Sequence, residues 1–311
     1  MDKREEYVKV LKKFDGYKAE NVITQSLVAN AFKKRSATVH KGSVGRLLIL
    51  GGSVGMTGAA IMAAQSSARC GCGLVTLASA QELNTIYETR LTEVMTCPLP
   101  SENGSVIYSS KDKIALHMQK CDAFLIGPGL SRSKDITRLV SELITESNAA
   151  LVIDADGLNA LAENVEVLKH AKQPVILTPH VGEFSRLTLK SVEEILQNPQ
   201  KHAVEFAKKY NVTLILKSHR TIVVTSDGEI YQNILGNPGM AKGGSGDVLA
   251  GCVASFVAQT GNMLLSALSG VYIHSLAADM AVEEFGEYSL LPTDTMNYLK
   301  YAIKETYDDI N

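Results

Sequence analysis

The stretch Asn237-Pro238-Gly239-Met240-Ala241-Lys242-Gly243-Gly244-Ser245-Gly246-Asp247 runs directly into the apolar segment Val248-Leu249-Ala250-Gly251. Flexible glycines let the backbone come close to a ligand, and the free N–H groups at the start of a helix bind anions. The pattern therefore predicts a cradle for a phosphate group or an oxyanion at the start of a buried helix.

Asp247 is expected in the first turn of that helix. The helix dipole favours a carboxylate at such a position, so Asp247 could simply be a helix-start residue. Beside an anion site, the same carboxylate can accept a proton from a hydroxyl group as phosphoryl transfer begins. We therefore interpret Asp247 as the catalytic base.

Two common nucleotide-binding loops do not occur in the sequence. No segment of the chain fits G-x-x-x-x-G-K-[ST], and Gly51-Gly52-Ser53-Val54-Gly55 does not fit G-x-G-x-x-G. The sequence therefore excludes a Walker A loop and gives little support to a hydride-transfer dehydrogenase.

Short β-branched or leucine-rich runs alternate with amphipathic stretches from Arg46 onward. This alternation is typical of βαβ units and predicts a largely parallel sheet. The predicted strands are residues 46–50, 74–78, 123–126, 150–154, 175–178, 212–217 and 221–225. Ligands bind beyond the carboxyl ends of such strands. Small or polar residues follow several of them: Gly51-Gly52-Ser53, Gly127-Pro128-Gly129, Asp154-Ala155-Asp156-Gly157, Pro179-His180-Val181-Gly182-Glu183 and Lys217-Ser218.

Composition narrows the class of protein. The chain has 311 residues, which suits one large α/β domain. Its 31 basic and 33 acidic residues give a net charge of -2 without a basic run, which disfavours a nucleic-acid partner. The five cysteines form no C-x-x-C pair and no zinc-binding spacing, which favours buried thiols in a reducing cytoplasm.

Residues 1–37 are polar and mostly helical in character, so we expect an N-terminal helical extension docked on a domain of residues 38–311. The charged start of the chain lacks the apolar stretch of a secretion signal, so we expect a cytoplasmic protein. Residues 248–282 are rich in apolar and small residues. Because polar residues such as His274 interrupt them, we predict two packed helices there and no membrane span.

A series of motifs resembles the NAD(P)H-hydrate dehydratases, over roughly residues 38–285. The last two motifs of the series are the specific ones. In order, the motifs are H-K-G-x-x-G (40–45), G-S-x-x-x-T-G-A (52–59), G-x-G-L-V (71–75), G-P-G-L (127–130), D-A-D-G-L-N-A-L (154–161), T-P-H-x-G-E (178–183) and N-P-G-M-A-x-G-G-S-G-D-V-L-A-G (237–251).

The resemblance implies a ribokinase-like, three-layer α/β/α fold with a mostly parallel central sheet. It also implies a repair reaction that consumes ADP or ATP, with Mg²⁺, to dehydrate the S-epimer of hydrated NADH or NADPH. The substrate hydroxyl would be phosphorylated transiently, and phosphate would then be eliminated. A homotetramer is a further expectation from the resemblance.

The resemblance also assigns site residues. Contacts to the hydrated dinucleotide are expected at Ala59, Gly129, His180 and Asp247. Contacts to the adenine nucleotide are expected at Lys217, Ser218, His219, Arg220, Thr221, Gly244, Ser245 and Gly246. Backbone N–H groups of Gly244 to Gly246 would hold the charge that develops on the transferred phosphoryl group.

Some positions leave alternatives open or depart from the family pattern. Glu183 either helps to hold Mg²⁺ through water or merely occupies the first turn of a helix. Ser218 follows Lys217 where glycine is usual, which puts close backbone approach to the nucleotide in doubt. Ser131-Arg132 stands where glycine is common and adds bulk and charge near the dinucleotide. Residues 1–37 carry no epimerase motif, so we expect no epimerase activity.

Two other functions compete with this interpretation. A small-molecule kinase of the same superfamily would phosphorylate a hydroxymethyl vitamin precursor, but such kinases typically have T-P-N-x-x-E where this chain has T-P-H-x-G-E at 178–183. A non-catalytic nucleotide-binding protein is the other alternative. Asp247 within an intact glycine loop argues against it.

Overall fold

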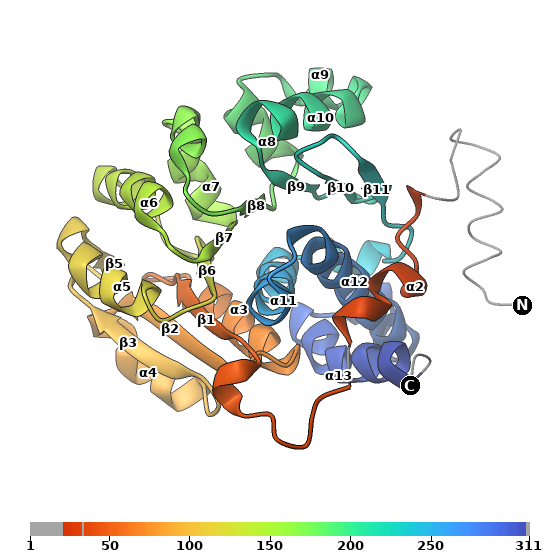
Figure 1. The fold of residues 1–311 in the computed structure, drawn as a ribbon, viewed down its shortest axis with the longest axis horizontal. Coiled ribbons are helices and arrows are strands. Elements are labelled where there is room, and N and C mark those ends of the chain that lie inside the picture. The colour runs from red at the N-terminus through yellow and green to blue at the C-terminus, as the bar shows by residue number, and fades with distance from the viewer. Residues whose placement is uncertain (1–20, 33, 309–311) are drawn as a thin grey trace, which may run out of the picture.

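The computed structural model describes residues 21–32 and 34–308. Its main sheet has nine strands in the order β11-β10-β9-β8-β7-β6-β1-β2-β3 (Figure 1). β10 runs antiparallel to both of its neighbours, and the other pairs are parallel. The strands are β1 (Arg46–Leu50), β2 (Leu74–Ala80), β3 (Met95–Leu99), β6 (Ala123–Ile126), β7 (Ala150–Ile153), β8 (Val175–Leu177), β9 (Thr213–Leu216), β10 (Ile222–Val224) and β11 (Ile230–Gln232), with a separate hairpin of β4 (Ser101–Glu102) and β5 (Ser105–Val106).

Helices cover both faces of the sheet, so the expected three-layer α/β/α arrangement is confirmed (Figure 1). One side carries α3 (Thr57–Arg69), α11 (Ser245–Thr260), α12 (Met263–Ser289) and α13 (Pro292–Asp308). The other carries α5 (Lys111–Met118), α6 (Lys134–Glu146), α7 (Ala155–Ala162), α8 (Val181–Thr188) and α10 (Pro199–Tyr210). The shorter helices are α2 (Gln25–Val28), α4 (Asn84–Arg90) and α9 (Val192–Gln197).

Every strand predicted from the sequence is present, with ends that differ by one or two residues at most. Central strands such as β6 are buried throughout, because helices pack on both faces of the sheet. No pattern in the sequence predicted β3 and β11, which are the two edge strands. β3 contains Pro98 and alternates in burial, and β11 is three residues long, so neither has the continuous apolar run that marks a central strand.

The apolar stretch at 248–282 forms α11 and α12, as predicted. Glycines bring these helices against their neighbours: a Cβ at Gly270 would lie 2.5 Å from Val253, and one at Gly251 would lie 2.3 Å from the Ala63 carbonyl oxygen. Within the described residues, α12 is long and apolar enough to cross a membrane, but 78% of that stretch is buried inside the protein. The apolar residues therefore serve helix packing.

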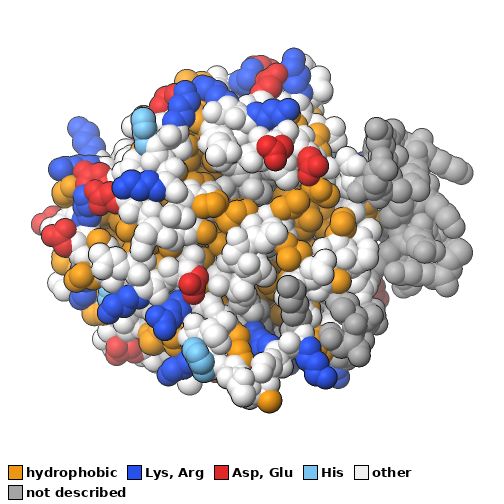
Figure 2. Space-filling view, viewed as in Figure 1, with side chains coloured by type: hydrophobic (Ala, Val, Ile, Leu, Met, Phe, Trp, Pro, Cys, Tyr) orange, Lys and Arg blue, Asp and Glu red, His pale blue; other side chains and the backbone are white. Residues whose placement is uncertain are grey.

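Residues 21–32 pack on the main body. Val22 and Ile23 are buried, and the Ile23 amide donates to the Gln232 carbonyl oxygen at 2.9 Å. Residues 1–20, where most of the expected helical extension falls, lie outside the described residues. On the face drawn in Figure 2, Lys and Arg side chains are interspersed with Asp and Glu side chains, so that face has no basic stripe for nucleic acid.

The strand order reverses between β1 and β6, because β2 and β3 continue to one side of β1 while β6 to β11 continue to the other. The loops after β1 and β6 therefore diverge from a common point, where open α/β sheets bind ligands. They are joined by the Gly52 amide, which donates to the Pro128 carbonyl oxygen at 2.8 Å.

Candidate active site

A cavity of about 830 Å³ opens beside the start of α11. Residues 236–247 form one wall of it, and the ends of β8 and β9 form another. The floor includes residues of α11 and α12. The predicted glycine-rich loop and the polar residues that follow β7, β8 and β9 thus meet in one cavity.

The glycine-rich loop is shaped by its own residues. Gly244 has a φ of +106° as the N-cap of α11, and a Cβ there would lie 2.7 Å from the Met62 side chain. The Ser245 hydroxyl donates to the Met240 carbonyl oxygen at 2.8 Å, and Asn237 Oδ1 accepts from the Gly239 amide at 3.1 Å. The loop therefore ends in a helix start whose first N–H groups have no acceptor within the helix.

Asp247 lies in the first turn of α11 and lines the cavity. Burial raises its pKa from 3.8 to about 7, and the negative charge of Asp154 adds to this effect. Lys217 opposes the rise. A carboxylate with a pKa near neutrality is a stronger proton acceptor than an ordinary aspartate, which fits the predicted role as a base.

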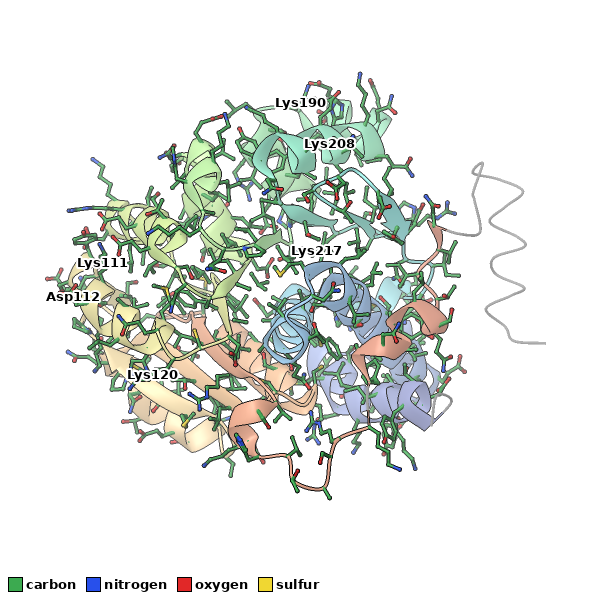
Figure 3. All side chains as sticks on the ribbon, in the orientation of Figure 1. Lys111, Asp112, Lys120, Lys190, Lys208 and Lys217 are labelled. Carbon is green, nitrogen blue, oxygen red and sulfur yellow. The ribbon has the colours of Figure 1, made fainter. Side chains whose placement is uncertain are left out.

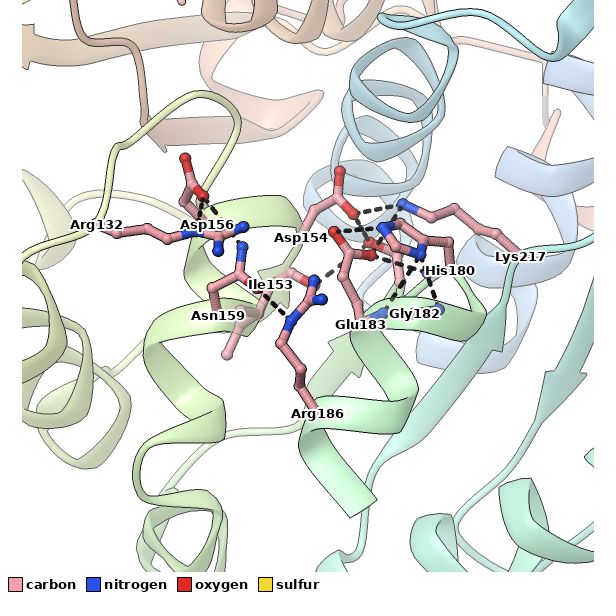
Figure 4. Close-up of polar contacts among 11 residues, drawn as sticks. Arg132, Ile153, Asp154, Asp156, Asn159, His180, Gly182, Glu183, Arg186 and Lys217 are labelled. Carbon is pink, nitrogen blue, oxygen red and sulfur yellow. Dashed lines mark hydrogen bonds and ion pairs between the residues drawn. The ribbon is translucent and has the colours of Figure 1, made fainter. Parts of the chain in front are cut away.

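Lys217 points inward, whereas Lys111, Lys120 and Lys190 lie at the periphery (Figure 3). Its Nζ is 2.7 Å from Asp154 Oδ1 and 3.9 Å from Glu183 Oε2. Burial acts to lower the pKa of Lys217, but the carboxylates of Asp154, Glu183 and Asp247 outweigh it and raise the pKa above its ordinary value. We call Asp154, Glu183 and Lys217 the Lys217 cluster (Figure 4).

Asp154 holds this cluster in place. Its carboxylate is buried, and Oδ1 accepts hydrogen bonds from the Thr178 hydroxyl and from Lys217 Nζ, both at 2.7 Å. Gly246 is close by, since a Cβ built on it would lie 3.3 Å from Lys217 Nζ. The cation is therefore directed at the start of α11, where an anion is expected to bind.

His180 and Glu183 form a reciprocal cap at the start of α8. His180 Nδ1 accepts from the Gly182 and Glu183 amides, and Glu183 Oε2 accepts from the His180 amide at 2.8 Å. Burial lowers the pKa of His180, which favours the neutral ring that this cap requires. Of the two alternatives for Glu183, the geometry supports a residue of the first helical turn.

The cavity brings together most of the residues predicted for the site. It is lined by His180, Lys217, Ser218, His219, Thr221, Gly244, Ser245, Gly246 and Asp247. Arg220 does not line it and belongs to the adjoining turn, where its amide donates to Ser218 Oγ at 3.1 Å. Ser218 does not have a positive φ, so its side chain causes no strain where glycine is usual in the family.

Ala59 and Gly129 lie outside this cavity. They are neighbours of each other, because a Cβ on Gly129 would lie 3.1 Å from the Ala59 Cβ. Both lie near the point where the strand order reverses, Ala59 in α3 and Gly129 after β6. α3 also carries Met62, which touches Gly244, so this second location adjoins the glycine-rich loop.

The loop after β6 also explains a departure from the family pattern. Ser131 has a φ of +69°, a left-handed conformation that glycine adopts at least cost. Asp156 stabilises this conformation of the loop, because its carboxylate accepts hydrogen bonds from the Ser131 amide at 3.0 Å and from Arg132 Nε at 3.2 Å. Arg132 is thereby held over α7 (Figure 4).

The cavity lining also includes polar residues that the sequence did not assign to the site, among them Asp154, Asn233 and His274. Asp154 is the last residue of the predicted strand 150–154 and follows β7 directly, so its position at a strand end is a signal for the site. His274 interrupts an apolar helix, a signal that was used only to argue against a membrane span. Asn233 had no signal in the sequence, because it is an isolated polar residue after a short edge strand.

Comparison with known proteins shows relatives in sequence and in structure. The family model described as NAD(P)H-hydrate dehydratase matches residues 47–300. An ADP-dependent (S)-NAD(P)H-hydrate dehydratase of Listeria monocytogenes is 32% identical over 285 residues, covering 91% of this chain and 96% of that protein. The chain spans about half the length of the bifunctional NAD(P)H-hydrate repair enzymes that it also matches, 55% and 53% in two of them.

Solved structures agree in fold. A ribokinase-like superfamily protein of Enterococcus faecalis aligns with a TM-score of 0.81 and 27% identity, covering 93% of this chain and 98% of that one. An ADP/ATP-dependent NAD(P)H-hydrate dehydratase of Bacillus subtilis, co-crystallised with ATP and Mg²⁺, aligns with a TM-score of 0.79 and 28% identity, covering 92% and 98%. The fold is therefore ribokinase-like, as the motifs predicted.

Proposed function

The chain belongs to the NAD(P)H-hydrate dehydratase family, and from this premise we propose that it uses ADP or ATP to dehydrate the S-epimer of hydrated NADH or NADPH. The observation that carries the proposal is the position of Asp247. Its carboxylate, with a pKa raised to about 7, lies at the start of α11 in the same cavity as Lys217 and His180.

In the proposed reaction, Asp247 takes the proton of the hydroxyl group on the hydrated nicotinamide ring. The oxygen then bonds to the terminal phosphorus of the nucleotide, and the bond between that phosphorus and the bridging oxygen of the departing nucleotide breaks. AMP is released from ADP, or ADP from ATP. Backbone N–H groups of Gly244 to Gly246 and the Lys217 ammonium face the negative charge that develops on the transferred group.

The second step is elimination. The carbon–oxygen bond to phosphate breaks with help from the ring nitrogen lone pair. The neighbouring carbon then gives up a proton to solvent, which restores the ring double bond. Phosphate leaves far more easily than hydroxide, so this step needs little from the protein beyond positioning. His180, Ala59 and Gly129 are the residues that we assign to holding the dinucleotide.

Mg²⁺ is proposed to arrive with the nucleotide. Among residues 21–32 and 34–308, no group of three or more His, Cys, Asp or Glu side chains could hold a metal ion. Both Glu183 oxygens face His180 atoms, so this carboxylate is engaged. Magnesium is commonly bound through substrate phosphates and water with few protein ligands. We assign no protein ligand to it.

A kinase of the same fold would share the first step and stop there. The two functions differ in the fate of the phosphate, because a kinase keeps it on the product. Membership of the dehydratase family and the His180 position both favour elimination.

The test uses purified protein with hydrated NADH and either ADP or ATP. Recovery of the near-ultraviolet absorbance of reduced nicotinamide, with release of one inorganic phosphate for each NADH formed, is the expected result. Absence of recovery with both nucleotides would reject the proposal. A stable phosphorylated product without recovery would favour the kinase.

Assembly and location stay predictions. We propose a cytoplasmic homo-oligomer, with a tetramer as the expected form, on the basis of the family resemblance. Light scattering of the purified protein would measure its mass in solution.

A further inference from the structure

The glycine-rich loop at 237–247 is held by contacts from outside the loop. Hydrogen bonds within it set its local shape, but a glycine-rich segment stays flexible unless other parts of the protein hold it. Backbone N–H groups stabilise a developing charge only when they are fixed in place before the reaction. The holding contacts come from α12, which packs against α11 (Figure 1).

Asp279 on α12 binds the start of the loop with both carboxylate oxygens. Its Oδ2 accepts from the Gly236 amide at 2.8 Å, and its Oδ1 accepts from Asn237 Nδ2 at 2.9 Å. Gly236 has a φ of +107°, a conformation that glycine adopts at least cost. Hydrogen bonds to a charged acceptor are stronger than those between neutral groups. Asp279 therefore fixes the point at which the chain enters the loop.

The effect of Asp279 reaches the loop through Asn237. Because Asn237 Nδ2 donates to Asp279, its Oδ1 is turned toward the loop, where it accepts from the Gly239 amide at 3.1 Å. A Cβ on Gly239 would lie 2.9 Å from the Glu287 carbonyl oxygen, so this part of the loop lies directly on α12. Asn237 lines the cavity, whereas Asp279 does not. Asp279 would thus act on a ligand through the residues that it holds.

Lys242 attaches the middle of the loop to the same helix. It lines the cavity, but its Nζ donates to the Tyr288 and Leu290 carbonyl oxygens at 2.7 and 2.6 Å. Carbonyl groups at the end of a helix have no donors within the helix, so a cation is favourable there. α12 therefore holds the loop at two points, near its start through Asp279 and near its middle through Lys242.

We propose that Asp279 is a positioning residue for phosphoryl transfer. It holds the glycine-rich loop so that the N–H groups at the start of α11 face the terminal phosphate of the nucleotide. The inference rests on the proposed use of ADP or ATP. A carboxylate that faced the phosphates would repel them. Both oxygens of Asp279 instead bind Gly236 and Asn237, which accounts for a carboxylate behind an anion site.

Binding calorimetry with ADP and AMP in the presence of Mg²⁺ tests this role, because the two nucleotides differ only in the terminal phosphate. The wild-type protein should bind ADP about ten-fold more tightly than AMP. Asp279→Asn keeps the shape of the side chain, but its amide group places a donor opposite Gly236 N–H or Asn237 Nδ2, which are donors themselves. The ratio of AMP to ADP dissociation constants should therefore fall to near one.

The ratio separates positioning from a merely structural role. General loosening of the cavity would weaken both nucleotides alike and leave the ratio unchanged. An unchanged ratio in Asp279→Asn would therefore overturn the proposal. Equal affinity of the wild-type protein for ADP and AMP would also overturn it, because the loop would then not hold the terminal phosphate.

The matched control is Glu283→Gln. Glu283 is an exposed carboxylate one turn further along α12, so its loss of charge should leave the ratio at the wild-type value. A fall as large as that in Asp279→Asn would overturn the proposal, because charge on the helix would then explain both. Asn237→Ala breaks the same series of hydrogen bonds from the loop side. Its ratio should also fall, and a wild-type ratio there would overturn the proposal even if Asp279→Asn does not fold.

The two proposals fail in different ways. Absence of ADP binding to the wild-type protein would reject the proposed function together with this inference. ADP binding that prefers ADP to AMP equally in the wild-type protein and in Asp279→Asn would reject this inference alone. Thermal unfolding of each variant shows whether the titrations report on folded protein.

Discussion

The glycine-rich loop at 237–247 and the Lys217 cluster line the same cavity but are built in different ways. The loop is one continuous segment that acts through backbone N–H groups and the conformational freedom of Gly244. The cluster joins side chains that are far apart in the chain: the ion pair of Lys217 with Asp154 spans 63 residues. A site built from one backbone segment can therefore be recognised as a sequence motif. A side-chain cluster forms only when the fold brings the ends of parallel strands to the same edge of the sheet.

Replacement of Asp247, the proposed base in the glycine-rich loop, should have the largest effect, and this effect is on turnover. Asp247→Asn keeps the shape of the first turn but cannot take a proton, so turnover should fall by roughly 10³-fold. ADP affinity should change little. Single-turnover kinetics with hydrated NADH, together with ADP calorimetry, measures both. Turnover close to that of the wild-type enzyme would remove Asp247 from the role of base.

Loss of a partner in the Lys217 cluster should chiefly affect stability. Asp154→Asn leaves the Lys217 ammonium, whose side chain is 18% exposed, without its nearest carboxylate. Breaking a buried pair in this way should lower the free energy of unfolding by about 3 kcal/mol, as measured by urea denaturation. The control is Glu166→Gln in the exposed ion pair with Lys209, where little change is expected. Equal losses in both variants would show that burial of the cluster is unimportant.

The raised pKa of Asp247 makes a pH-dependent prediction. Its pKa is 3.8 when exposed and about 7 in the folded protein, so folding favours the protonated form. Wild-type stability should therefore decrease as pH rises between these values, and Asp247→Asn should remove that decrease. We expect the variant to be more stable by about 4 kcal/mol near pH 8 and equal to the wild type below about pH 4. Urea unfolding at both pH values measures the difference, and a constant difference would contradict the raised pKa.

His180 has both a local structural role and a place in the cavity, because its ring caps α8 and also lines the cavity. His180→Ala should weaken binding of the hydrated dinucleotide about ten-fold and lower stability by about 1 kcal/mol. His180→Asn separates the effects, since asparagine is a good N-cap but lacks Nε2. His180→Asn should restore the stability that His180→Ala loses, but it should not restore the affinity for the hydrated dinucleotide. Unchanged affinity in both variants would count against the assignment of His180.

The smallest effect is expected at Ser131, where φ is +69°. Ser131→Gly should raise the free energy of unfolding by about 0.5 kcal/mol, because glycine adopts this conformation without strain. Ser131→Ala keeps the strain and should give no gain. Thermal unfolding of the two variants compares them directly. Equal stability of the two would show that the left-handed conformation costs nothing here.

Much of the fold followed from the sequence. Central strands such as β6 are apolar runs because they are buried on both faces, and α11 and α12 are rich in small residues because helices approach them closely. β3 and β11 escaped prediction because edge strands need no such run. The site was predicted in part: the motifs placed Asp247, His180 and Lys217, and the structure brought them into one cavity.

By itself, the sequence determined the central strands and the glycine loop at the start of α11, because apolar runs and glycine-rich turns are local patterns. Only the tertiary structure decided which charges meet. The pairing of Asp154 with Lys217 and the raised pKa of Asp247 both depend on burial and on strand order. Burial strengthens electrostatic interactions and makes unpaired polar atoms costly, and it depends on which segments the fold brings together.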